Sequence, residues 1–212
     1  MTARRRTRFL SAWCVWLVAA SFASAALTAP TAALPANSVY QLDVPLTDQN
    51  GAGFRLAERR GMPVLATMFF ANCQFVCPRI FAALKATEAK LTAAERAKLR
   101  AVAVTFDPER DDTAALKGIV DEHHLDTRHN SVARTDARSV RKLAAALGIQ
   151  YRALPNGDFN HTSVLILLDV DGRIVGKTST LGEADPAFVN LVRKTIAASG
   201  KPVAPIAPKR AT

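Results

Sequence analysis

The sequence predicts an α/β fold in which buried strands alternate with helices within one domain. Two continuous apolar runs, residues 64–70 and 101–106, have the length of buried strands, and each is followed by a segment with helical spacing of apolar residues. Later in the chain, residues 169–172 read Asp-Val-Asp-Gly between the strand candidates 163–168 and 173–178, which indicates a β-hairpin. A length of 212 residues corresponds to one globular domain with additional segments.

The start of this domain predicts a hairpin that precedes the first buried strand. Residues 39–46 are extended, residues 48–51 form a turn and residues 54–56 return, which indicates an N-terminal β-hairpin. The helix after the first buried strand runs to about residue 90. It places three apolar side chains on one face, namely Ile80, Phe81 and Leu84.

Local capping signals predict the next two helices. Thr92 and Glu95 have the spacing of a capping box, which indicates a short helix before the second buried strand. Thr113 is a suitable cap for a helix after that strand, which we expect to end near His124. The apolar residues of this helix are Leu116, Ile119 and Val120.

The remaining elements follow from similar signals. Residues 132–133 are a short strand candidate, and residues 136–147 form a helix that Gly148 ends in the position where a left-handed residue is needed. Asp185 as cap and Pro186 at the first helical position begin the last helix.

The order of these elements is a β-hairpin, two strand–helix units, a further helix, an antiparallel pair of strands and a last helix. Strands that alternate with helices and end in an antiparallel hairpin are typical of a thioredoxin-like sandwich. We therefore expect residues 36–199 to form a thioredoxin-like domain with an N-terminal β-hairpin extension.

The first 29 residues have the pattern of an export segment. Four arginines within residues 4–8 precede an apolar stretch that leads into the small residues Ala23, Ser24 and Ala25. This order of basic, apolar and small residues indicates a secretory signal peptide. Residues 9–29 are also about long enough to span a bilayer as an uncleaved N-terminal membrane anchor. In both cases we expect an exported, periplasmic domain that is either soluble or tethered to the inner membrane by residues 9–29.

The net charge of +10 is concentrated at the two ends of the chain. Four positive charges belong to the export segment, and three belong to residues 200–212, a proline-spaced basic tail that we expect to be flexible. Without these ends, the folded body carries a charge of +3 and no basic face interleaved with aromatic residues. This distribution argues against nucleic-acid binding.

Three cysteines are also too few for a scaffold that is held together by disulfides.

Cys73 and Cys77 are the chemically distinctive pair, because they lie four residues apart where the first buried strand leads into its helix. On a helix, residues four positions apart lie on the same face, with their β-carbons about 5–6 Å apart. Backbone amides at a helix N-terminus also lower the pKa values of nearby thiols. Three fates remain open for two close thiolates in an oxidising compartment: a disulfide, a soft metal site, or cycling between thiol and disulfide. A static disulfide across so short a loop would constrain little of the unfolded chain.

His161 is the candidate for a third ligand. It stands just before the predicted strand 163–168, and in a thioredoxin-like fold that junction faces the helix with the cysteines. Two sulfurs and one nitrogen suit copper(I), and copper(II) is compatible with the same ligands, whereas a closed zinc site needs a fourth ligand. The alternative is a hydrogen-bonded histidine at a strand end, with no metal.

The other three histidines are weaker candidates. His123 and His124 are adjacent on a helix, so their side chains diverge by about 100°, and we expect both at its solvated end. His129 lies in a polar segment, where we expect it to be solvated as well.

Three motifs, in this order, resemble those of the SCO/SenC family of copper-binding assembly proteins. They are Cys73-Gln-Phe-Val-Cys77-Pro78, Asp107-Pro-Glu-Arg-Asp111 and Asn160-His161-Thr162, each beside an apolar strand. The resemblance covers residues 39–198 and implies a thioredoxin fold with Cys73, Cys77 and His161 as copper ligands. It also implies a membrane-facing role in building the binuclear copper centre of cytochrome c oxidase. Related proteins are linked to the thiol–disulfide handling of the oxidase subunit's cysteines and to nitrous oxide reductase maturation.

The sequence departs from the family's pattern at three places near these ligands. Ala71 and Asn72 stand before the first cysteine, where many relatives have Thr. Gln74 and Phe75 stand where relatives often have Pro-Asp, and Asn160 stands where many have Asp before the histidine. A carboxylate beside His161 would orient its ring and raise its basicity.

Residues 107–111 have two interpretations. Asp and Pro suit a loop after a strand, and Asp111 and Asp112 favour the start of the next helix. In the functional interpretation, Arg110 and Asp111 support the metal loop or a docking surface nearby.

Three functions from different classes are compatible with these residues. The first is a copper metallochaperone, a binding protein rather than an enzyme, which passes copper(I) or copper(II) to a client by ligand exchange. The second is a thiol–disulfide oxidoreductase with Cys73 and Cys77 as its redox pair, and the third is a peroxidase-like enzyme with a cysteine thiolate. We expect the first, acting as a monomer on the copper-centre subunit of cytochrome c oxidase or a related copper enzyme.

Overall fold

The computed structural model describes residues 33–200 of the 212-residue chain. The predicted export segment, residues 1–29, and residues 201–212 of the predicted tail lie outside the described residues. Between residues 33 and 200, no helix is both long and apolar enough to cross a membrane.

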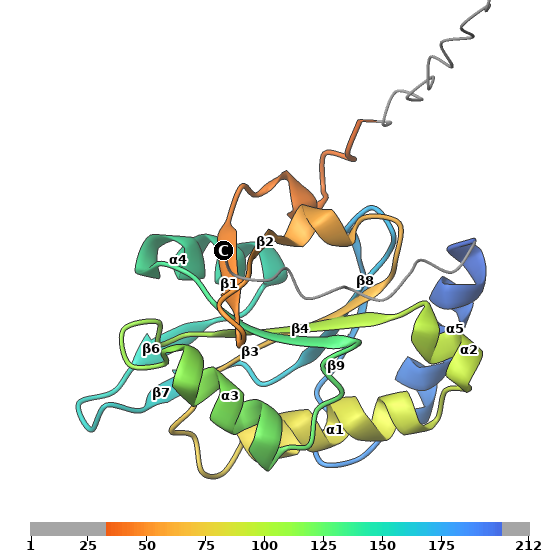
Figure 1. Cartoon of the computed structure of the whole chain (residues 1–212). Helices are drawn as coiled ribbons and strands as arrows, with labels where there is room; N and C mark the ends of the chain where they lie inside the picture. The colour runs from red at the N-terminus through yellow and green to blue at the C-terminus, as the bar shows by residue number, and fades with distance from the viewer. Residues whose placement is uncertain (1–32, 201–212) are drawn as a thin grey trace, which may run out of the picture. The chain divides into compact units, whose positions relative to one another are not determined.

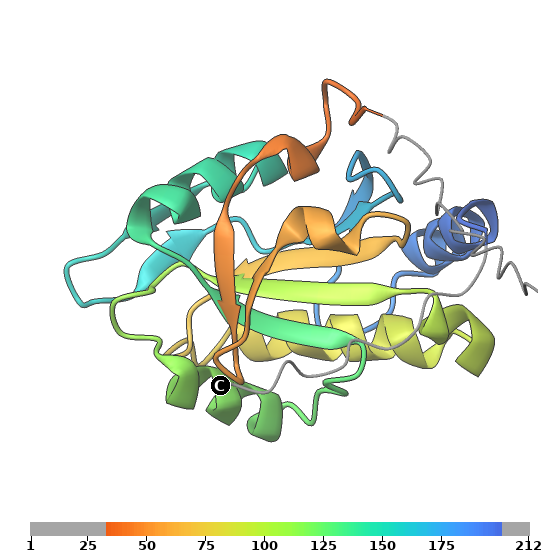
Figure 2. The same ribbon diagram turned by 45° about the horizontal axis from the view of Figure 1, so that its top comes forward.

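Seven strands form one mixed sheet, and helices cover both of its faces (Figure 1). In spatial order the strands are β2 (Gly53–Arg55), β1 (Pro45–Asp48), β5 (Asn130–Arg134), β4 (Arg100–Thr105), β3 (Val64–Phe69), β8 (Leu165–Leu168) and β9 (Ile174–Thr178). The helices are α1 (Cys77–Ala89), α2 (Ala93–Ala97), α3 (Thr113–Glu122), α4 (Ala137–Leu147) and α5 (Pro186–Ala198), with short 3-10 helices η1 (Val39–Gln41) and η2 (Leu56–Arg59). α1 and α3 lie on one face of the sheet and α4 lies on the other, as Figure 2 shows from a second side. The predicted α/β sandwich is confirmed.

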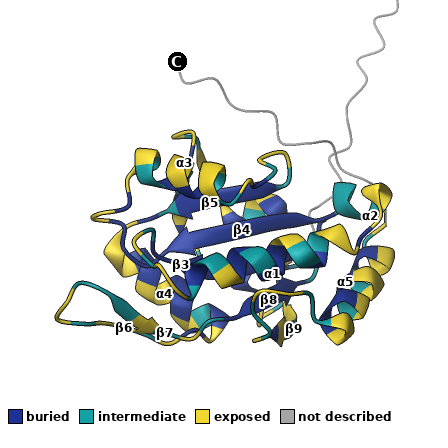
Figure 3. Ribbon diagram, turned by 90° about the horizontal axis from the view of Figure 1, so that it is seen from below, coloured by how far each residue is buried: buried dark blue, intermediate teal, exposed yellow. Residues whose placement is uncertain are grey.

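The two strands that the sequence predicts to be buried form the centre of the sheet. β3 and β4 are buried along their whole length, and Figure 3 shows them as a dark band between more exposed helices. They pair in parallel, from Val64 opposite Arg100 to Phe69 opposite Thr105, while β8 pairs antiparallel with the other side of β3. Because parallel strands end at the same edge of a sheet, the segments that follow β3 and β4 leave the core side by side.

Most helix ends follow the predicted signals. In α2, the Glu95 N–H donates to the Thr92 hydroxyl and the Thr92 N–H donates to the Glu95 carboxylate, which completes the capping box. Gly148 ends α4 with a φ of 67°, in the left-handed region. Asp185 caps α5, and its carboxylate accepts hydrogen bonds from two backbone N–H groups.

Two element starts differ from the prediction. The cap of α3 is Asp112 rather than Thr113, because the Asp112 carboxylate accepts a hydrogen bond from the Ala115 N–H at 2.9 Å. The N-terminal hairpin of β1 and β2 is confirmed, but β1 begins later than predicted because η1 occupies the start of the expected strand.

A two-stranded hairpin, β6 (Tyr151–Ala153) and β7 (Phe159–His161), is absent from the predicted elements. Its turn closes with the Leu154 N–H donating to the Asp158 carbonyl at 2.8 Å, and Gly157 adopts a φ of 83°. The Asn-Gly pair in this turn is the sequence signal that indicates such a hairpin. His161 is therefore the last residue of a separate hairpin.

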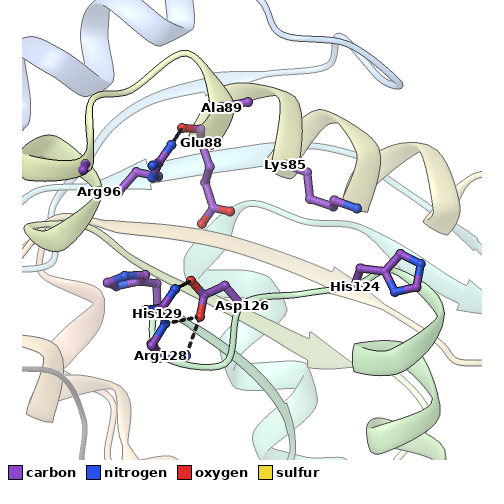
Figure 4. A pocket seen from close by; sticks show the side chains of 9 residues that line it. Lys85, Glu88, Ala89, Arg96, His124, Asp126, Arg128 and His129 are labelled. Carbon is purple, nitrogen blue, oxygen red and sulfur yellow. Dashed lines mark hydrogen bonds and ion pairs between the residues drawn. The ribbon is translucent and has the colours of Figure 1, made fainter.

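A cavity of about 450 Å³ is lined by α1, α2 and the segment before β5. Figure 4 shows the Glu88 side chain pointing into it. Burial raises the pKa of Glu88 to about 7. The nearby Asp126 adds to this rise, while Asn130, Arg96 and Lys85 oppose it. An ionised Glu88 is therefore a cost to the fold.

We expect Glu88→Gln to stabilise the protein at alkaline pH but not at acid pH. The pKa of Glu88 is higher in the folded state, about 7, than in the unfolded state, near 4.5. The stability that protonated Glu88 contributes is therefore complete below pH 4.5 and is lost as the pH rises through about 7, whereas Gln stays neutral throughout. The gain in unfolding free energy by urea denaturation should be of the order of 1 kcal/mol at pH 8, given screening at a half-buried site, and should vanish near pH 4. Glu183→Gln, at an exposed glutamate, is the control, and equal effects at both pH values would contradict the prediction.

Candidate metal centre

The cysteine pair lies where β3 leads into α1. Cys77 is the first residue of α1, whereas Cys73 lies in a turn before the helix. The Cys73 N–H donates to the Phe70 carbonyl at 3.3 Å. The expectation that both cysteines share a helical face is therefore wrong for Cys73. The Cys77 N–H donates to the Cys73 Sγ at 3.3 Å, so the turn brings the two side chains together at the helix N-terminus.

His161 completes the group at the end of β7. One ligand atom from each of Cys73, Cys77 and His161 lies within 4.8 Å of the other two. Among the described residues, this is the one group of three or more cysteine, histidine and acidic side chains with such spacing. The fold thus brings His161 close to the two cysteines, which lie 84 and 88 positions before it in the sequence.

The spacing of this group fits a single soft metal ion. Metal–sulfur bonds of about 2.3 Å and metal–nitrogen bonds of about 2.0 Å place the ligands of a three-coordinate ion about 4 Å apart. The atoms therefore need to approach one another by less than about 1 Å on binding. Two sulfurs and one imidazole nitrogen form a soft donor set suited to copper(I).

The surroundings of His161 determine its protonation and orientation. Its ring packs against Phe106, with centroids 4.9 Å apart, and stands edge-on to Phe70 at 6.1 Å. Burial lowers the pKa of His161, which favours the neutral form that binds metals. Its Nδ1 lies 3.3 Å from the Thr162 carbonyl and 3.4 Å from the Ser163 hydroxyl. When Nδ1 carries the proton and donates it to that carbonyl, the lone pair of Nε2 is left to bind a metal. The Thr162 carbonyl thus orients the ring, although residue 160 is Asn and offers no carboxylate.

The expected lowering of both thiol pKa values is wrong for Cys77. Its side chain is 1% exposed, and burial raises the pKa of Cys77 well above its ordinary value. The apolar surroundings thus outweigh the favourable end of the helix at this position. A metal ion that binds here has to displace the proton of this thiol.

Residues 107–111 form hydrogen bonds with the segment before Cys73 and with the β6–β7 turn. The buried Asp111 carboxylate accepts hydrogen bonds from the Ala71 N–H, at 2.9 Å, and from the Thr105 hydroxyl. The Arg110 guanidinium donates to the Asp107 carboxylate and to the carbonyl of Gly157 in the β6–β7 turn. The segment therefore links the turn before Cys73 to the β6–β7 turn, and its next residue, Asp112, caps α3 as the structural interpretation predicts.

The other histidines lie away from this group. His123 stacks on Phe81 with centroids 4.6 Å apart, and burial lowers its pKa, so the prediction of a solvated side chain is wrong there. His124 and His129 line the separate cavity of Figure 4. The Nδ1 of His129 lies 3.3 Å from a nitrogen of Arg100.

A second cavity, of about 440 Å³, opens beside the cysteines and was not indicated by any motif. Its lining includes Cys73 and Phe75 on one side and Leu154 and Phe159 on the other. Phe75, between the two cysteines, is 82% exposed. The cavity gives a reacting group access to Cys73 without unfolding of the core.

Asp111→Ala should loosen the turn that carries Cys73. The change leaves the Ala71 N–H and the Thr105 hydroxyl without their buried acceptor, at a cost of about 1–3 kcal/mol of unfolding free energy. Chemical denaturation measures this loss, and iodoacetamide should modify Cys73 faster than in the wild type. Asp43→Ala removes an exposed ion pair with Arg55 and should change neither value appreciably. Equal alkylation rates in the Asp111 variant and the wild type would refute the supporting role.

The SCO1/SenC family profile matches residues 34–196 of this chain. Among characterised relatives, the mitochondrial SCO2 homolog of Mus musculus is 38% identical over 95 residues, which is 44% of this chain and 37% of the mouse protein. The aligned part thus spans little more than a third of that relative's length.

Solved structures share the fold. Bradyrhizobium japonicum ScoI with copper bound is 24% identical with a TM-score of 0.58, covering 72% of this chain and 96% of that one. BsSco, a member of the Sco family of cytochrome c oxidase assembly proteins with an identified disulfide switch, is 22% identical with a TM-score of 0.61, covering 73% and 90%. These likenesses establish a thioredoxin-like fold. Since the family profile spans nearly the whole described domain, cysteine pair and His161 included, the chain belongs to the SCO1/SenC family.

Proposed function

We propose that this protein is a copper metallochaperone that binds one copper ion through Cys73, Cys77 and His161 and delivers it to the binuclear copper centre of a respiratory oxidase. The observation that carries the proposal is the convergence of these three ligand atoms within 4.8 Å. The family membership and the copper-bound relative from Bradyrhizobium japonicum support copper as the cargo.

The chemistry of the group favours holding copper for transfer. Two thiolates and an imidazole satisfy copper(I) with three ligands, so an incoming sulfur can join before an existing ligand leaves. Cys73 lines the open cavity while Cys77 is buried. The exchange therefore begins on the Cys73 side, with Cys77 and His161 retaining the ion.

The proposed client is the copper-centre subunit of cytochrome c oxidase or a related copper enzyme. The description of BsSco as belonging to a family of oxidase assembly proteins supports this choice. We propose that the protein acts as a monomer in the periplasm, where residues 1–29 direct it as a signal peptide or anchor.

Anaerobic copper(I) titration of the reduced protein, against a competing chelator, should give one tightly bound ion per chain. Cys73→Ala and Cys77→Ala each remove a sulfur ligand and should abolish tight binding. His161→Ala should weaken binding by at least about tenfold, since it leaves two-coordinate copper. His124→Ala, an exposed histidine outside the group, is the matched control.

The metallochaperone proposal fails if the wild type binds no copper tightly, or if His161→Ala leaves the affinity unchanged. Delivery is measured with the same loaded protein and the copper-free soluble domain of an oxidase copper-centre subunit. Copper should move from the loaded protein to the subunit. If the loaded protein retains all of its copper, the proposal that this subunit is the client is wrong.

A thiol–disulfide oxidoreductase is the second candidate, favoured by the proximity of the two free cysteines. The Cys73 thiolate would attack a client disulfide and release one client thiolate, and Cys77 would then displace the second client thiol to form the Cys73–Cys77 disulfide. The client gains two electrons, and an external dithiol restores the pair.

Turnover of a client disulfide with such a dithiol separates the two functions. If the protein is an oxidoreductase, turnover should disappear in Cys73→Ala and persist in His161→Ala, because the imidazole takes no part in the exchange. Turnover no faster than that of the dithiol alone would exclude this function.

A further inference from the structure

The two halves of the metal centre are carried by different substructures. Cys73 and Cys77 follow β3, an interior strand of the seven-stranded sheet that pairs with β4 and β8. His161 ends β7, whose only ladder partner among the described residues is β6. The separation between the sulfurs and the imidazole therefore depends on how the β6–β7 hairpin is held against the rest of the domain.

Aromatic contacts hold one side of this hairpin. Tyr151 of β6 stacks on Phe106, with centroids 4.8 Å apart, and Phe159 of β7 packs on Phe70 at 5.2 Å. The burial of these rings stabilises the packing but is largely non-directional, apart from the modest geometric preference of aromatic pairs. They keep the hairpin against the body without fixing its position along the ring faces.

Arg110 supplies a directional contact at the other end of the hairpin. Its guanidinium Nη2 donates to the Gly157 carbonyl in the turn, while its Nε donates to the Asp107 carboxylate. Two donors of one planar fork are thus engaged at once, which limits the orientation of the side chain.

The segment that carries Arg110 is itself fixed to the cysteine side of the centre. The Asp111 N–H donates to the Asp107 carbonyl at 2.9 Å. The Asp111 carboxylate holds the Ala71 N–H, two residues before Cys73. A continuous chain of hydrogen bonds therefore runs from the cysteine turn through residues 107–111 to the β6–β7 turn.

We propose that Arg110 is a positioning residue of the metal centre, which sets the distance of His161 from Cys73 and Cys77 by tying the β6–β7 turn to residues 107–111. The role of Arg110 in positioning the β6–β7 hairpin rests on its hydrogen bonds alone. Its effect on bound copper rests on the proposed function.

Gly157 provides a second way to break the same contact. A β-carbon at this position would lie 2.9 Å from the Arg110 Nη1, and the φ of 83° already disfavours other residues. Gly51, in the β1–β2 turn, has a φ of 78° but no atom within 4 Å of such a β-carbon. Gly51→Ala therefore introduces the same kind of backbone strain without displacing a side chain.

The first experiment measures amide hydrogen exchange in the full-length, metal-free protein. Arg110→Gln and Gly157→Ala should speed exchange in residues 151–161 at least about tenfold relative to β3 and β4, whose exchange stays at the wild-type rate. Arg173→Gln removes a comparable pair, since Arg173 is 44% exposed beside Asp169 and Arg110 is 50% exposed beside Asp107. Neither this variant nor Gly51→Ala should affect residues 151–161.

The second experiment uses the copper(II) complex. Arg110→Gln should shift the thiolate-to-copper absorption band and the electron paramagnetic resonance spectrum, and weaken binding by about tenfold. Arg110→Lys should not restore the spectrum, because a single ammonium cannot engage both acceptors in this geometry. Arg173→Gln should keep the wild-type spectrum.

Wild-type exchange in residues 151–161 of both variants would overturn the inference, as would faster exchange with an unchanged copper spectrum. A wild-type protein that binds neither copper(I) nor copper(II) would instead overturn the proposed function. In that case the exchange experiment still decides whether Arg110 holds the hairpin.

Discussion

The parallel pairing of β3 with β4 is the constraint on which the arrangement of the site depends. Both strands are buried along their whole length, so their register is fixed by the core on either face. The Phe106 N–H still donates to the Phe69 carbonyl at 2.6 Å beyond the last paired residues. This pairing places the cysteine turn and residues 107–111 beside each other at one sheet edge, where Asp111 reaches Ala71.

The same core also controls the charge of the metal-free centre. Burial raises the pKa of Cys77 and lowers that of His161, so both groups favour their neutral forms when no metal is present. A buried Cys77 thiolate without a cation would be costly. A copper ion that binds releases a proton and supplies the compensating positive charge, so affinity and protonation are linked.

Local signals were sufficient for most of the fold, whereas His161 became a candidate ligand through the expected topology and the family resemblance. Apolar runs of strand length identified β3 and β4, and caps such as Asp185 and Gly148 identified helix ends, because these features depend on residues close in sequence. The β6–β7 hairpin has too few apolar residues for a strand pattern, although its Asn-Gly turn was a usable signal. The pKa of Cys77 depends on how deeply tertiary packing buries it, which no spacing reveals. The reach of Arg110 to Gly157 is likewise a tertiary contact over 47 positions.

The long interval between the ligands has a consequence for when the centre comes into existence. β3 is flanked on one side by β4 and on the other by β8, which lies about 100 positions further along the chain. A chain synthesised only as far as β4 presents two nearby thiols without the imidazole, which lies 84 positions beyond Cys77. Three-ligand binding therefore requires the β6–β7 hairpin to pack beside the cysteine turn, and a metal ion held by all three side chains reports that this long-range contact has formed.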